Sequence, residues 1–116
     1  MTFKEPVGVC ALIAPWNFPA AMTTRKVGPS LAGGCTVVMK PPAEAPLTSL
    51  AIMSLAEQEG IPAGVVNFVT ALENTVEVGE NLTRNTLVSK VSFAGSTAVS
   101  MLLMSQSAST LKRLSF

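Results

Sequence analysis

Residues 7–14 read Val-Gly-Val-Cys-Ala-Leu-Ile-Ala, and Pro15-Trp16-Asn17-Phe18-Pro19 follows them directly. The apolar run shows no alternation of polar and apolar residues. Such a continuous run is typical of a strand that is covered on both faces of a sheet. We therefore predict a buried strand at Val7–Ala14, and the two prolines of the next segment mark its end.

Similar signals repeat along the rest of the chain. Three further short apolar runs predict strands at 35–39, 65–69 and 88–93, while helical spacing and stop signals predict helices at 20–31, between Pro46 and Gly60, at 75–82 and at 96–108. Four successive strand–helix units are typical of parallel strands that are joined by right-handed helical crossovers. The expected fold class is therefore α/β, with a doubly wound parallel sheet.

The composition is short of charge for a free-standing domain. Hydrophobic residues make up 48% of the chain and charged residues 13%, whereas soluble domains carry roughly 25% charged residues. A membrane protein would explain this, but a spanning helix needs about 20 consecutive apolar residues. The runs Val7–Ala14 and Met101–Met104 are much shorter. We therefore expect no membrane segment, and a surface that is covered by further protein.

Several classes of function have no support in the residues present. A net charge of +1 gives no electrostatic basis for binding nucleic acid, and we expect the pair Lys112-Arg113 to be a solvated helix edge. The chain has no histidine, so it contains no serine or cysteine triad that uses one. Cys10 and Cys35 lack metal-ligand spacing, and we expect buried structural thiols and no metal site.

Candidate binding residues lie at the predicted carboxyl ends of the strands, where open α/β sheets bind ligands. Gly95-Ser96 opens a predicted helix, so it is either a simple turn and cap or a phosphate site at the helix N-terminus. Lys40 ends a strand and should emerge at the sheet rim, either as a surface lysine or as a cation for ribose or phosphate. Trp16-Asn17 is either a rigid loop with a packed indole or the site of an amide donor to an oxyanion.

Four motifs, taken in order, resemble those of the aldehyde dehydrogenase superfamily. They are Pro-Trp-Asn-Phe-Pro at 15–19, Val-Met-Lys-Pro at 38–41, Gly-Ile-Pro-Ala-Gly-Val-Val-Asn at 60–67 and Ser-Phe-Ala-Gly-Ser-Thr at 92–97. The segments 22–28 and 87–93 look most like those of NAD(P)-dependent succinate-semialdehyde dehydrogenases. The resemblance covers essentially the whole chain and implies a Rossmann-like dinucleotide-binding domain.

The resemblance also implies roles for individual residues. NAD or NADP would be the cofactor, with Trp16 and Asn17 on the nicotinamide side, Lys40 at the adenosine ribose and Gly95 and Ser96 at the pyrophosphate. The residues expected to bind cofactor are Pro15, Trp16, Asn17, Lys40, Gly95 and Ser96.

Further implied roles concern the substrate and the reaction. Asn17 would also donate to the oxyanion, and Arg25 would bind the distal carboxylate of the aldehyde, since guanidinium takes carboxylate bidentately. In the family, a cysteine thiolate attacks the aldehyde, hydride passes to NAD(P)⁺, and a glutamate-activated water hydrolyses the thioester.

We expect residues 1–116 to be part of the NAD(P)-binding domain, without the catalytic domain that holds this cysteine and without the glutamate base. The isolated chain should then be inactive, and the full-length enzyme should be an intracellular homo-oligomer, cytoplasmic or mitochondrial. The alternative is a non-catalytic nucleotide-binding or regulatory remnant of such an enzyme.

Three positions depart from the family pattern. Ala43 stands where many members carry a glutamate that excludes a 2′-phosphate, so we expect NADP to be tolerated. Ser100 replaces the final glycine of Gly-Ser-Thr-x-x-Gly, which would limit close approach to the pyrophosphate. Ala94 replaces a threonine and removes a hydroxyl from the turn.

Overall fold

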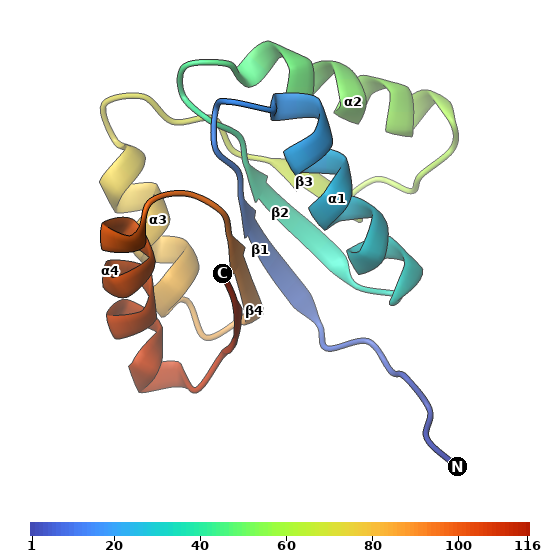
Figure 1. Ribbon diagram of the computed structural model, residues 1–116. Helices are drawn as coiled ribbons and strands as arrows, with labels where there is room; N and C mark the ends of the chain where they lie inside the picture. Colours follow the sequence, from blue (N-terminus) through green and yellow to red (C-terminus); the bar gives the residue numbers. More distant parts are fainter.

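The strand predicted from residues 7–14 forms the middle of a five-stranded parallel sheet in the computed structural model, which describes residues 1–116 (Figure 1). Helices alternate with the strands along the chain. The elements are β1 (Val9–Ile13), α1 (Pro19–Ala32), β2 (Thr36–Lys40), α2 (Pro46–Gln58), β3 (Val66–Phe68), α3 (Thr75–Arg84), β4 (Val88–Phe93), α4 (Thr97–Ser107), a short 3-10 helix (Ala108–Thr110) and β5 (Arg113–Ser115).

The strand order is β3-β2-β1-β4-β5, and every neighbouring pair is parallel. The chain winds outward from β1 to β3 and then crosses back to place β4 on the other side of β1. The order therefore reverses between β1 and β4. Backbone pairing continues past the strand ends, because Ala14 donates to the Lys40 carbonyl at 3.3 Å and Ala94 to the Ile13 carbonyl at 3.2 Å. The segments that follow β1, β2 and β4 thus leave the sheet side by side.

The sheet is covered on both faces, as a doubly wound fold requires (Figure 1). Cys10 and Leu12 of β1, and Ala14 directly after it, belong to the core on the side of α1. Ala11 and Ile13, which point the other way, belong to the core beneath α3 and α4. Alternate side chains of one apolar strand thus fill two cores, which confirms the prediction that β1 is buried on both faces.

The four predicted strand–helix units are confirmed, but the end of the chain adds a strand that was not predicted, and one expectation there was wrong. Arg113–Ser115 forms a fifth strand, whose residues pair with Lys90–Ser92. The pair Lys112-Arg113 is not a helix edge. The Lys112 ammonium donates to the Asn85 carbonyl and, at 2.7 Å, to the Val88 carbonyl, so its side chain connects the start of β5 to the loop before β4. No helix is both long and apolar enough to cross a membrane.

Candidate functional site

A cavity of about 690 Å³ opens at the carboxyl ends of β1, β2 and β4, beside α3 and α4. This is the point at which the strand order reverses, and the crevice there is where open α/β sheets bind ligands. Five of the six residues predicted to bind cofactor line it together: Pro15, Trp16, Lys40, Gly95 and Ser96.

The first turn of α4 faces this cavity through Ser96. Ser96 is the N-cap, with extended backbone angles (φ −73°, ψ 150°), and its hydroxyl accepts a hydrogen bond of 3.4 Å from the Val99 amide. The first amides of a helix have no partner within the helix, and the helix dipole adds positive potential. The turn therefore suits an anion such as a phosphate.

Gly95 stands against an aromatic ring. A Cβ atom at this position would lie 2.3 Å from Cζ of Phe93, far inside van der Waals contact. Phe93 is itself buried at the end of β4. Glycine is therefore required here because the backbone passes directly over the ring, which keeps the turn into α4 close to the sheet end.

Lys40 does not emerge at the sheet rim as expected. It is 5% exposed, and its ammonium group makes one long hydrogen bond of 3.4 Å to the Pro41 carbonyl. Burial lowers the pKa of Lys40, and the neighbouring Glu44 carboxylate partly opposes this shift. An ammonium group has three donors, so Lys40 lines the cavity with donors free for a ligand.

The Trp16-Asn17 segment is open to solvent. The Trp16 indole is 65% exposed and lines the mouth of the cavity, so the alternative of a packed indole was wrong. Asn17 is exposed and does not line this cavity. The structure therefore groups Trp16 with the other candidate cofactor residues and leaves Asn17 just outside them.

Arg25 lies elsewhere, at a second cavity of about 1180 Å³ beside α1. This cavity is rich in cations: Lys4, Arg25, Lys26, Lys90 and Arg113 line it, with Glu5 as the single carboxylate. Burial, together with the charges of Lys90 and Arg25, lowers the pKa of Lys26 to about 8. An anion in this cavity would relieve the repulsion among these side chains.

Both cysteines line the second cavity and are buried, as expected for structural thiols. Burial raises the pKa of Cys10, and the neighbouring Cys35 raises it further. A raised pKa keeps a thiol protonated, and the protonated form is the poor nucleophile. Neither cysteine lies at the cavity that Ser96 and Lys40 line.

These motifs and this geometry are matched by known proteins. The model of the aldehyde dehydrogenase family matches residues 1–116. The chain belongs to the aldehyde dehydrogenase family. It is 60% identical over 115 residues to succinate-semialdehyde dehydrogenase [NADP(+)] 1 of Schizosaccharomyces pombe, a match that covers 99% of this chain and 23% of the relative.

Solved aldehyde dehydrogenase structures share the fold. Succinate-semialdehyde dehydrogenase from Burkholderia pseudomallei superposes with a TM-score of 0.93 at 53% identity, over 97% of this chain and 23% of that one. A C291A mutant of aldehyde dehydrogenase C from Pseudomonas syringae, in complex with NAD⁺ and octanal, gives 0.90 at 41% identity, over 95% and 22%. The chain thus spans less than a quarter of the length of these aldehyde dehydrogenases.

The three residues that depart from the aldehyde dehydrogenase pattern differ in their relation to the cavity. Ala43 lines the cavity next to Lys40, as does Glu44. Ser100 does not line it, and its hydroxyl donates to the Ser96 carbonyl at 3.1 Å. Ala94 lines both cavities. The Ser100 side chain therefore forms a hydrogen bond within α4 and is not part of the cavity wall.

The cavity also contains residues that sequence reasoning did not assign to a site. Its far end lies between α3 and α4 and is lined by Leu72, Thr75, Val76, Gly79, Val99, Leu102, Leu103 and Gln106. The only signal in the sequence was the helical row of Val99, Leu102, Leu103 and Gln106, which indicated one face of α4 without showing what it faces.

Proposed function

We propose that this chain is the dinucleotide-binding part of an NAD(P)-dependent aldehyde dehydrogenase that oxidises an aldehyde carrying a distal carboxylate, with succinate semialdehyde as the favoured substrate. The observation that carries the proposal is the single cavity that gathers Trp16, Lys40, Gly95 and Ser96 from three strand ends. The names of the Schizosaccharomyces pombe and Burkholderia pseudomallei relatives support the choice of substrate.

The donors around the cavity fit a dinucleotide. The α4 N-terminus at Ser96 suits a pyrophosphate, and the buried ammonium of Lys40 suits ribose hydroxyls or an added phosphate. Ala43 offers no carboxylate to repel a 2′-phosphate, so we propose that NADP is accepted as well as NAD. When bound, the nicotinamide supplies the acceptor for the substrate hydride.

The cationic cavity beside α1 fits the other end of the substrate. Arg25 is exposed there, next to Lys26, and a guanidinium holds a carboxylate through two parallel hydrogen bonds. Such a pair would select an ω-carboxylated aldehyde over an uncharged one of equal length. We propose Arg25 as the substrate-binding residue and Asn17 as the oxyanion donor of the same reaction.

The nucleophile and the general base are proposed to come from residues of the full-length protein outside these 116. Cys10 and Cys35 are buried away from the cofactor cavity. Of the seven glutamates, Glu44 lines that cavity, where it faces Lys40. We therefore expect the 116-residue chain by itself to show no turnover. The two free cysteines also suit a reducing compartment, cytoplasmic or mitochondrial.

The test compares two substrates in the full-length gene product. With NADP⁺ as cofactor, KM and kcat are measured for succinate semialdehyde and for butanal, which has the same length and no carboxylate. Arg25→Met should raise KM for succinate semialdehyde roughly tenfold or more, as expected for loss of a charged hydrogen-bonded pair, and leave butanal unchanged. Arg84→Met is the matched control, because Arg84 pairs with Glu80 on the outside of α3.

Two outcomes would contradict the proposal. Equal effects of Arg25→Met on both aldehydes would remove Arg25 from the substrate site. Dinucleotide binding without turnover of any aldehyde in the full-length protein would instead favour a non-catalytic nucleotide-binding remnant.

A further inference from the structure

The contact between α1 and α2 contains two buried hydroxyl groups. The two helices pack against each other on the side of the sheet away from α3 and α4 (Figure 1). Thr23 and Val27 are the buried residues of α1, and Ser49 is the one buried residue of α2. Oγ1 of Thr23 lies 2.8 Å from Oγ of Ser49, and both residues are 0% exposed. Serine and threonine are mostly exposed in proteins, so a polar pair at this contact is unusual.

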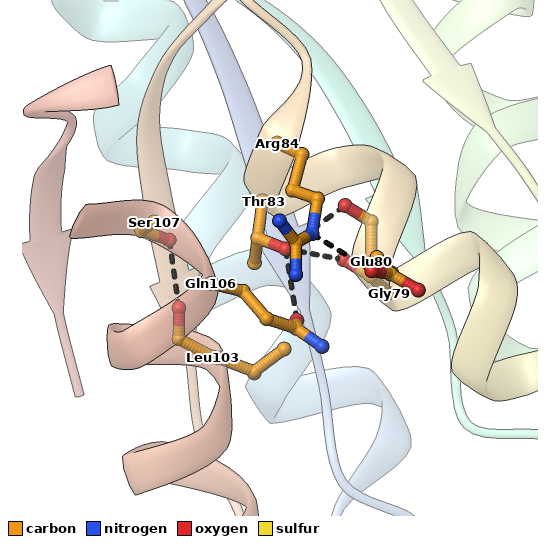
Figure 2. A network of polar contacts seen from close by, with 7 residues as sticks. All are labelled: Gly79, Glu80, Thr83, Arg84, Leu103, Gln106 and Ser107. Atoms are coloured by element: carbon orange, nitrogen blue, oxygen red, sulfur yellow. Dashed lines mark hydrogen bonds and ion pairs between the residues drawn. The ribbon is translucent and has the colours of Figure 1, made fainter. Parts of the chain in front are cut away.

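Thr23 depends on Ser49 for its hydrogen bond. The buried threonine of α3 shows the contrast. Oγ1 of Thr83 has two carbonyls of its own helix at 3.0 Å, and it also lies 2.9 Å from Gln106 of α4 (Figure 2). Thr23 makes no such bond within α1, and Ser49 is its one partner. Loss of either hydroxyl would leave the other buried and unpaired.

The Thr23–Ser49 bond joins the two helix backbones closely. Each hydroxyl oxygen is attached to the β carbon, so no long side chain separates it from its helix. A hydrogen bond has a preferred length and direction, whereas the hydrophobic effect is non-directional. The bond therefore fixes the rotation of α1 about its own axis relative to α2, which an apolar contact of the same size would not do.

This rotation determines where Arg25 lies. Successive residues of an α-helix are about 100° apart around its axis. Arg25 is two residues after Thr23 and therefore lies on nearly the opposite side of α1, where it lines the cationic cavity. The next residue, Lys26, donates to Ser92 of β4 at 2.8 Å. Arg25 is thus placed in the sequence between the two residues whose side-chain hydrogen bonds attach α1 to α2 and to β4.

We propose that Thr23 and Ser49 are positioning residues, whose hydrogen bond holds Arg25 in place for the carboxylate of the substrate. The inference rests on the proposed role of Arg25. A guanidinium binds a carboxylate through two parallel hydrogen bonds, so the orientation of Arg25 matters as well as its charge. A small rotation of α1 becomes a larger displacement at the end of the long arginine side chain. An aldehyde without a carboxylate forms no such pair and should not depend on the Thr23–Ser49 bond.

The experiment uses the full-length gene product with NADP⁺ and measures KM and kcat for succinate semialdehyde and for butanal. Thr23→Val keeps the shape of the side chain and removes the hydroxyl. It should raise KM for succinate semialdehyde about fivefold, less than the loss of a charged hydrogen-bonded pair, and leave KM for butanal unchanged. Thr23→Ser restores the hydroxyl and should return KM close to that of the unchanged protein.

Thr24→Val is the matched control. Thr24 is the residue next to Arg25, but its hydroxyl bonds only within α1, to the carbonyls of Ala20 and Ala21. KM for both aldehydes should equal that of the unchanged protein. A double-mutant cycle then tests whether Thr23 acts through Arg25. In the Arg25→Met background, Thr23→Val should cause no further rise in KM for succinate semialdehyde.

A second double variant separates positioning from stability. Thr23→Val alone leaves the Ser49 hydroxyl buried and unpaired, which should lower the free energy of unfolding. Thr23→Val combined with Ser49→Ala removes both hydroxyls, and replacement of both partners by apolar groups is nearly neutral for stability. The free energy of unfolding in urea should therefore recover, while KM for succinate semialdehyde should stay raised. This double variant also provides the test if Thr23→Val alone does not fold.

The outcomes separate the inference from the proposed function. If Arg25→Met raises KM for succinate semialdehyde and the Thr23 variants do not, the positioning role is overturned and the proposed function stands. The same conclusion follows if KM recovers together with stability in the variant that lacks both hydroxyls. If Arg25→Met affects both aldehydes equally, the substrate role of Arg25 is overturned, and the positioning role with it.

Discussion

The ammonium group of Lys26 on α1 donates a hydrogen bond of 2.8 Å to the hydroxyl of Ser92 on β4. The bond links the helix after β1 to the strand on the far side of the point where the strand order reverses. Lys26 is also partly buried and lies near the charges of Lys90 and Arg25, and these effects together lower its pKa to about 8. The charged form of Lys26 therefore costs the folded state free energy.

The pH dependence of stability should reveal this cost. Between about pH 8 and the ordinary lysine pKa of 10.5, the unfolded chain binds a proton that folded Lys26 has lost. The free energy of unfolding should therefore rise with pH through this window, and below pH 8 the penalty is fully present. Lys26→Met should remove this rise and stabilise the chain at pH 7.

Urea denaturation at pH 7, 8, 9 and 10 checks this expectation. Burial lowers the pKa of Lys40 and Lys112 as well, so the informative quantity is the difference between the variant and the unchanged chain. Lys4→Met, at an exposed position, is the control. Parallel pH profiles for Lys26→Met and the unchanged chain would show that Lys26 is not strained.

Gly95→Ala should damage both the fold and the cofactor site. The new methyl group would lie 2.3 Å from Cζ of Phe93, so the ring or the turn must shift. Overpacking of this kind costs roughly 1–3 kcal/mol, and the shift should weaken dinucleotide binding because Gly95 and Phe93 line the same cavity. Denaturation and calorimetry measure the two effects.

Gly28→Ala is the matched control for that substitution. Gly28 lies inside α1, and a Cβ atom there has no neighbour within 4 Å. Alanine is favoured over glycine in a helix by about 1 kcal/mol, so this variant should be slightly more stable and should bind cofactor normally. A Gly95→Ala variant that behaves in the same way would contradict the close packing against Phe93.

Asn17→Ala in the full-length protein should separate catalysis from binding. Loss of one oxyanion donor lowers kcat by about 10²–10³-fold. Because Asn17 does not line the cofactor cavity, Kd for the dinucleotide should stay within about twofold. Asn81→Ala, on the exposed side of α3, is the control. A parallel loss of dinucleotide affinity would instead assign Asn17 to the cofactor.

The sequence predicted what depends on local patterns. The continuous apolar run of β1 and the proline and glycine signals around α2 indicated these elements and the parallel fold. The three residues of β5 gave no signal, since Arg-Leu-Ser is neither a long apolar run nor a clear alternation. β5 forms because Leu114 pairs with Val91 of β4, which is distant in the sequence.

Individual side chains were harder to predict than elements. Lys40 was expected at the surface because isolated lysines are rarely buried, yet Pro41 and Pro42 are buried beside it and leave little of it exposed. The contact between Thr83 of α3 and Gln106 of α4 was not predicted, because it depends on how the two helices pack. Such contacts depend on tertiary structure, which cannot be predicted from the spacing of residues within one helix.

The two cavities lie on opposite sides of the sheet, and Phe93 and Ala94 are the residues that line both. If one holds the dinucleotide and the other the aldehyde, each ligand has an entrance of its own. The carboxylic acid could then depart while the reduced dinucleotide is still bound. Release of one product would not depend on release of the other. This part of the enzyme would therefore not impose a strict order of product release.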